Sequence, residues 1–119
     1  MLRFYSYRSC DSCRKAKKWL KDQGLEFTEI PIREQPPSKC ELAQMRAARG
    51  NLKALFSTSG GDYRSMNLAA KVDSMSDDDA FDLMSENGNL VKRPFLIGNG
   101  IALQGFRLAE WEAALDQSD

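Results

Sequence analysis

The chain has 119 residues, 42% of them hydrophobic, which suits one compact domain with a core of ordinary size. Its 17 basic and 17 acidic residues cancel, so it lacks the excess positive charge typical of proteins that bind nucleic acid directly. Three cysteines are too few for a disulfide-rich secreted scaffold. The sequence shows neither a signal-peptide pattern nor an apolar run long enough to span a membrane, so we expect a cytoplasmic protein. We also expect a monomer.

The first third of the chain predicts a β-α-β unit. Residues 1–7 mix aromatic and apolar side chains in a strand-like run. Asp11 or Ser12 then offers an N-cap to a helix that ends at Gly24. The apolar stretch that follows predicts a second strand, which Pro31 confines to an edge of the sheet or to its own end.

Helices dominate the middle of the predicted structure. Ser38 and Glu41 have the spacing of a capping box, and the helix that they begin should end near Gly50. A short helical piece follows. The turn-rich stretch 57–67 is expected to be a loop, and Ser76 caps a further amphipathic helix.

The last part of the chain predicts a β-hairpin and a closing helix. Two short apolar runs meet at Asn99-Gly100, which is typical of a two-residue hairpin turn. The final helix should begin near Arg107, with Leu108 among the residues of its apolar face. The polar residues 116–119 are expected to fray.

The order of these elements predicts the fold class. A β-α-β unit and a β-β-α unit separated by a helical block correspond to an α/β protein with a thioredoxin-like fold. The block at about 34–88 would be a helical insertion between the two halves of a single domain that covers residues 1–119.

Two of the three cysteines lie where the first predicted strand meets the first predicted helix. Cys10 precedes the helix and Cys13 falls in its first turn, in C-x-x-C spacing. A helix N-terminus stabilises a thiolate through the helix dipole and free backbone N–H groups. Arg8, Arg14 and Lys15 add positive charge nearby. This context favours a redox pair in which Cys10 attacks and Cys13 resolves.

Three other interpretations of the pair remain open from the residues alone. Half of a zinc site would need two more ligands, but the chain has no histidine and only Cys40 besides the pair. A structural disulfide is uncommon in a cytosolic protein, and two inert small residues would not require a strand-to-helix junction. We expect no metal site, and we expect Cys40 to be a buried or bystander cysteine without a catalytic role.

Three stretches together resemble a known family. They are "SCDSCRKAKKWL", "FSTSGGDYR" and "VKRPFLIGNGIALQGF", and they are similar to the glutaredoxin-type arsenate reductases, a family that also holds the Spx and MgsR regulators and the YffB-like proteins. The likeness runs from Met1 to about Leu115 in motif order and spacing. It implies a thioredoxin-like domain with a helical insertion, in agreement with the order of elements.

The resemblance also implies roles for individual residues. Cys10 would be the redox-active nucleophile, and Cys13 is present as in Spx and MgsR. Arg93 would point its guanidinium group at the cysteine, where it can hold an oxyanion or stabilise a thiolate. Pro94 would be a cis-proline that faces the active site. The residues expected to contact the substrate are Arg64, Arg93, Pro94 and Arg107.

Two positions depart from the arsenate reductase pattern. Ser59 and Phe106 stand where the reductases of the family have arginines that grip the oxyanion. Each lost charged hydrogen bond removes roughly 1.5–3 kcal/mol of anion-binding energy. We therefore expect weak arsenate reduction or none.

Two functional hypotheses follow. The first is a thiol-disulfide oxidoreductase that acts on a small thiol or disulfide, with no bound cofactor and with glutathione or a thioredoxin-type reductant as co-substrate. The alternative is an Spx-like, redox-sensing transcriptional regulator that binds the α subunit of RNA polymerase, in which a Cys10–Cys13 disulfide changes the surface near the first helix. Neither hypothesis involves direct contact with nucleic acid or with a membrane.

Overall fold

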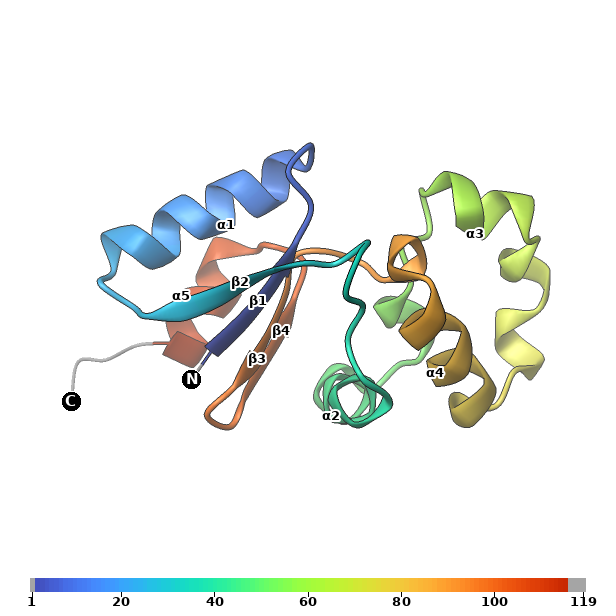
Figure 1. Ribbon diagram of the computed structural model, residues 1–119. Helices are drawn as coiled ribbons and strands as arrows, with labels where there is room; N and C mark the ends of the chain where they lie inside the picture. The colour runs from blue at the N-terminus through green and yellow to red at the C-terminus, as the bar shows by residue number, and fades with distance from the viewer. Residues whose placement is uncertain (1, 116–119) are drawn as a thin grey trace.

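The protein folds around a four-stranded mixed sheet (Figure 1). The computed structural model describes residues 2–115. The strands are β1 (Leu2–Ser6), β2 (Phe27–Pro31), β3 (Phe95–Gly98) and β4 (Ile101–Gln104). Their order is β2-β1-β3-β4, with β2 parallel to β1 and the other neighbours antiparallel. β2 is thus an edge strand, as its proline predicts.

Helices cover both faces of the sheet. The α-helices within the described residues are α1 (Asp11–Asp22), α2 (Lys39–Arg49), α3 (Gly61–Ser65), α4 (Asp77–Glu86) and α5 (Leu108–Leu115). Short 3₁₀ segments lie at Lys53–Leu55, Leu68–Ala70, Val72–Ser74 and Gly88–Leu90. In Figure 1, α1 and α5 lie on the side of the sheet away from α2, and α3 and α4 lie farther out beyond α2. The predicted α/β thioredoxin-like fold, with a helical insertion between its halves, is confirmed.

The two faces of the sheet contribute to two separate hydrophobic cores. Successive residues of a strand point to opposite faces, so Phe4 and Tyr5 of β1 belong to different cores. The core beneath α1 and α5 consists of Leu2, Phe4, Ala16, Leu20, Leu96, Leu103, Trp111 and Leu115. The second core joins Tyr5, Phe95 and Ile97 to buried residues of the insertion. Each buried large side chain contributes about 1.5–3 kcal/mol, so burial fixes the insertion firmly against the sheet.

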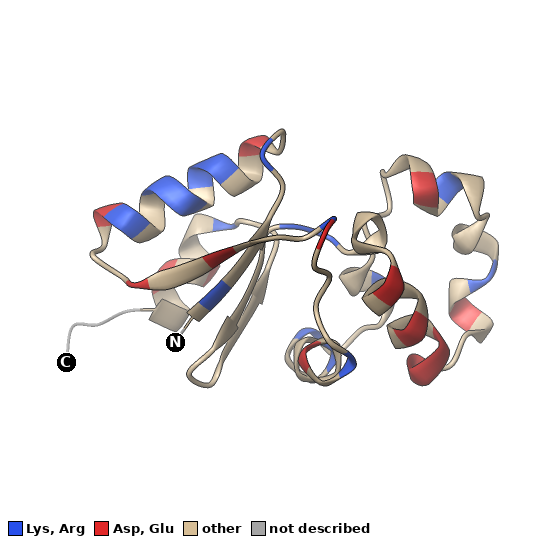
Figure 2. Cartoon of the chain, viewed as in Figure 1, with Lys and Arg blue, Asp and Glu red and all other residues tan. Residues whose placement is uncertain are grey.

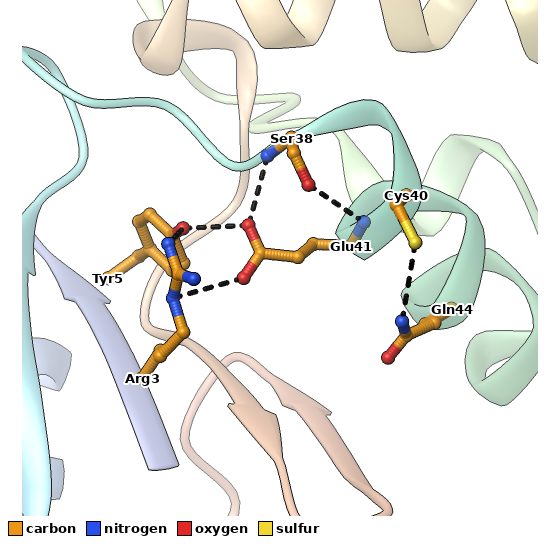
Figure 3. Close-up of polar contacts among 6 residues, drawn as sticks. All are labelled: Arg3, Tyr5, Ser38, Cys40, Glu41 and Gln44. Atoms are coloured by element: carbon orange, nitrogen blue, oxygen red, sulfur yellow. Dashed lines mark hydrogen bonds and ion pairs between the residues drawn. The ribbon is translucent and has the colours of Figure 1, made fainter. Parts of the chain in front are cut away.

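A polar network ties β1 to the start of α2 (Figure 3). The Glu41 carboxylate accepts hydrogen bonds from the Tyr5 hydroxyl at 2.7 Å and from the Ser38 backbone N–H at 3.0 Å, and it pairs with Arg3 Nε at 3.2 Å. The Ser38 hydroxyl in turn accepts from the Glu41 N–H, which completes the predicted capping box. Burial, followed by the Glu41 hydrogen bond, raises the pKa of Tyr5 to about 12. One carboxylate therefore both caps α2 and holds it to the sheet.

Charges are distributed unevenly among the helices. Figure 2 shows basic residues along α1 and acidic residues along α4. The acidic residues of α4 face α2, because Lys39 pairs with Asp78 and Asp82 and Arg46 lies 3.5 Å from Asp77. Exposed pairs of this kind contribute little stability each, so they orient the two helices rather than hold them together.

Two details of the sequence prediction are wrong. The expected loop 57–67 contains helix α3, which is too short to give a periodic signal in the sequence. Two contacts hold this helix in place. Tyr63 is buried, and the Asp62 carboxylate accepts hydrogen bonds from the side-chain amides of Asn87 and Asn89. Leu108 is 47% exposed rather than buried, because α5 begins at this residue and turns its later residues toward the sheet.

The hairpin prediction is confirmed. Asn99 and Gly100 connect β3 to β4 with φ values of 53° and 79°, the pair of positive φ angles that a type I′ turn requires. The predicted polar tail at 116–119 lies outside the described residues. None of the helices within residues 2–115 has the length and hydropathy needed to span a membrane.

Gly88 marks the tightest backbone approach in the insertion and gives a test of the fold. A Cβ atom added there would lie 1.9 Å from the Ile32 carbonyl oxygen, so Gly88→Ala must push two backbone segments apart. We expect a loss of about 2–3 kcal/mol in the free energy of unfolding, measured by urea denaturation. Gly61→Ala is the matched control, because a Cβ there meets nothing within 4 Å. Equal stabilities of the two variants would contradict this packing.

Candidate functional site

Cys10 is the N-cap residue of α1. Its extended backbone, with φ −98° and ψ 115°, lets its Sγ accept a hydrogen bond from the Cys13 backbone N–H at 3.2 Å. The prediction of Asp11 or Ser12 as N-cap is wrong, because the Cys10 N–H bonds the Tyr7 carbonyl at 3.0 Å and the helix begins one residue earlier. A half-buried sulfur therefore occupies the position where a helix N-terminus best stabilises negative charge.

Cys13 is the inner thiol of the pair. It is 3% exposed, and burial, followed by its hydrogen bond with Cys10, raises its pKa to about 12. The charge of Arg93 acts in the opposite direction and lowers the pKa of Cys13. The two sulfurs thus differ in exposure, with Cys10 half-buried and Cys13 buried.

The Arg93–Pro94 peptide bond is cis, as the resemblance implies. The carbonyl of buried Pro94 accepts a hydrogen bond from the Gly105 N–H at 2.8 Å, which ties this turn to the end of β4. The guanidinium carbon of Arg93 lies 5.2 Å from the centre of the Tyr7 ring. Its Nη1 atom is buried and has no hydrogen-bond partner among the described residues.

A pocket of about 390 Å³ lies beside the N-terminus of α1 and is lined in part by Ser12. Four cations line it, and Glu110 is the acidic residue among its lining residues. Arg93 and Arg107, both expected from the sequence, meet there with Arg49 and Lys92. Arg49 extends from α2 and donates to the Gln104 carbonyl at 2.7 Å, so the insertion supplies one wall of this pocket. We call it the basic pocket.

Sequence reasoning missed Arg49 and Lys92. Lys92 directly precedes Arg93 in the "KRP" segment, so its position was a usable signal. Arg49 lies at the end of α2, far from both the cysteines and the "KRP" segment in the sequence, and no local pattern relates it to either. The remaining expected residue, Arg64, is exposed on α3 and does not line the basic pocket.

The structure also shows where Cys40 lies and whether its described residues could bind a metal ion. Cys40 lies in the first turn of α2 and is exposed, so of the two expectations, a buried or a bystander cysteine, the first is wrong and the second stays a prediction. Its Sγ accepts from the Gln44 side-chain amide at 3.6 Å. Within residues 2–115, no group of three or more His, Cys, Asp or Glu side chains is arranged to hold a metal ion.

Comparison with known proteins identifies similar chains. A model of the ArsC family matches residues 5–114. YusI of Bacillus subtilis (strain 168) is 45% identical over 112 residues, which cover 93% of this chain and 95% of YusI. The regulatory protein MgsR of the same organism is 31% identical over 110 residues, covering 92% of this chain and 86% of MgsR.

The fold is also similar to a solved structure. A possible arsenate reductase from Streptococcus mutans UA159 superposes with a TM-score of 0.83 and 38% sequence identity. The match covers 90% of this chain and 92% of the other. The similar proteins thus include both a possible arsenate reductase and a regulatory protein.

The difference between the two thiols predicts selective alkylation. Brief treatment of the reduced protein with iodoacetamide at pH 8 should modify Cys10 at least about tenfold faster than Cys13, because Cys13 is buried and stays protonated. Peptide mass spectrometry measures each site, and exposed Cys40 serves as the internal control for reagent access. Equal labelling of Cys10 and Cys13 would contradict the assignment of inner and outer thiols.

Proposed function

The chain belongs to the ArsC family, and we propose that it is a thiol-disulfide oxidoreductase in which Cys10 attacks and Cys13 resolves. The observation that carries this proposal is the hydrogen bond from the Cys13 N–H to the Cys10 Sγ at the start of α1. The outer sulfur accepts this bond at the helix N-terminus, a position that favours negative charge, while the inner sulfur lies buried one helical turn away and burial raises its pKa to about 12.

The proposed reaction proceeds in two exchange steps. The Cys10 thiolate attacks one sulfur of a substrate disulfide, forms a mixed disulfide and expels the other half as a thiolate, which takes up a proton. Cys13 then loses its proton to solvent or to the leaving group and attacks the Cys10 sulfur, which releases the second half as a thiol and leaves a Cys10–Cys13 disulfide. Glutathione or a thioredoxin-type reductant returns the two electrons to the protein.

The basic pocket supports a preference for substrates that carry separated anionic groups. Arg93 and Arg107 line it together with Arg49 and Lys92, so positive charge is spread over a volume larger than one small oxyanion needs. Charged hydrogen bonds from arginine suit carboxylates well. A disulfide of glutathione carries several carboxylates and matches this chemistry. Arsenate would be bound less well, because Ser59 and Phe106 stand where arginines would contact the oxyanion.

Substrate charge tests this proposal directly. With glutathione disulfide as substrate, Cys10→Ser should abolish turnover, and Arg107→Gln should raise KM about 3- to 10-fold through the loss of one charged contact. With neutral bis(2-hydroxyethyl) disulfide, Arg107→Gln should leave KM unchanged. Lys21→Gln, which removes an exposed cation at the far end of α1, is the control. Turnover that survives Cys10→Ser would refute the mechanism.

The likeness to MgsR supports a second candidate function, a redox-sensing regulator that binds RNA polymerase. The surface next to the pair would change when Cys10 and Cys13 form a disulfide. The resemblance to Spx places Gly50 and the loop after it at the polymerase contact, but Gly50 has a φ of 72° and is the C-cap of α2, so its conformation alone explains the glycine.

A pull-down separates the regulator from the enzyme. The carboxy-terminal domain of the RNA polymerase α subunit is immobilised and offered the reduced and the oxidised protein. The regulator hypothesis predicts association that differs between the two states by about tenfold or more. Absence of association in both states, together with disulfide turnover, would exclude it in favour of the oxidoreductase.

A further inference from the structure

The side chain of Tyr7 lies beside two arginines that come from distant parts of the chain. The guanidinium carbons of Arg33 and Arg93 lie 4.9 Å and 5.2 Å from the centre of its ring, within the range of cation–π attraction. Arg33 follows β2, and Arg93 precedes β3. The Tyr7 hydroxyl also accepts a hydrogen bond from Arg33 Nη1 at 2.8 Å, which fixes the orientation of the ring.

The backbone of the same residue holds both thiols. The Tyr7 carbonyl accepts the Cys10 N–H at 3.0 Å, and a hydrogen bond from the Tyr7 backbone lowers the pKa of Cys13 against the larger effect of burial. The main chain of Tyr7 therefore positions the sulfurs while its side chain contacts Arg93.

Arg93 depends on the ring for its orientation. Its Nη1 is buried without a hydrogen-bond partner, and no ion pair within residues 2–115 holds its guanidinium group. A long, charged side chain without fixed partners loses little by turning toward water. The negative face of the Tyr7 ring is a contact of this charge within residues 2–115.

The charges around Tyr7 agree with this arrangement. A hydrogen bond with Ser9, followed by the charge of Arg33, lowers the pKa of the Tyr7 hydroxyl. Arg8 acts in the same direction. Hydrogen bonds from Asn87 and Asn89, and to a smaller extent the charge of Arg33, lower the pKa of Asp62 on the insertion.

We propose that Tyr7 is a positioning residue, whose ring keeps the Arg93 guanidinium at the wall of the basic pocket beside the N-terminus of α1 and so raises the reactivity of Cys10. The proposal rests on the proposed function for its biological role, since a more populated thiolate speeds attack on a disulfide. Tyr7 takes no part in bond making; it acts through Arg93. Its loss should resemble a partial loss of Arg93.

The test measures Cys10 alkylation by iodoacetamide across pH in a Cys40→Ser background. Tyr7→Leu should slow alkylation about 3- to 30-fold at pH 7, where the thiolate fraction limits the rate, and leave it unchanged at pH 11. Tyr7→Phe keeps the ring and should stay within about twofold of the wild type. Tyr7→Met is a second ring-free variant whose flexible side chain fills the same space if the leucine variant does not fold.

A double-mutant cycle separates positioning from a general structural effect. In an Arg93→Met background, Tyr7→Leu should cause no further loss at pH 7, because the cation that it positions is gone. Phe27→Leu removes another half-buried aromatic ring, one that contacts Phe4 rather than an arginine, and should leave the profile unchanged. Additive losses in the cycle, or a wild-type rate for both ring-free variants, would overturn the proposal.

Alkylation needs no disulfide substrate, so the two proposals fail independently. A protein that turns over no disulfide but shows the shifted profile would refute the oxidoreductase and retain the role of Tyr7. Disulfide turnover together with an unshifted alkylation profile in Tyr7→Leu would retain the oxidoreductase and refute the role of Tyr7.

Discussion

The hydrogen bond from the Cys13 backbone N–H to the Cys10 Sγ is the interaction on which the rest of the site depends. Cys10 thus serves as the N-cap of α1, a position that serine, threonine or aspartate usually occupies. The first turn of the helix therefore directs a backbone N–H group at a sulfur. The same turn buries the second thiol beneath the first. Strand β1 delivers the chain to this point, and the core beneath α1 keeps the helix in place.

The helical insertion takes part in the site as well as in the fold. It reaches the sheet through Glu41, which binds Tyr5, and it reaches the basic pocket through Arg49, which binds the Gln104 carbonyl. The second core buries the insertion against the sheet, so these polar contacts are held in register. Cations from the second half of the chain and from the insertion therefore line one pocket beside the N-terminus of α1, and a small neutral domain gains a locally basic surface.

The sequence predicts the features that local physics controls. The capping box at Ser38 and the hairpin turn at Asn99-Gly100 follow from short patterns, and both occur as predicted. The N-cap at Cys10 does not follow from such a pattern, because Asp11 and Ser12 are stronger capping types and only the bond to the Tyr7 carbonyl selects the cysteine. Contacts between distant segments, such as Arg49 with Gln104 and Tyr7 with two arginines, have no signal in a single sequence.

The most direct measurement is the trapping of the mixed disulfide. In a Cys40→Ser background, the protein is incubated with excess glutathione disulfide and its intact mass is recorded. If Cys10 attacks and Cys13 resolves, Cys13→Ser should carry one lasting glutathione adduct on Cys10, whereas the protein that retains both cysteines should lose the adduct and form a Cys10–Cys13 disulfide. An adduct on Cys13 in Cys10→Ser of comparable yield, or equally lasting adducts with and without Cys13, would contradict this account.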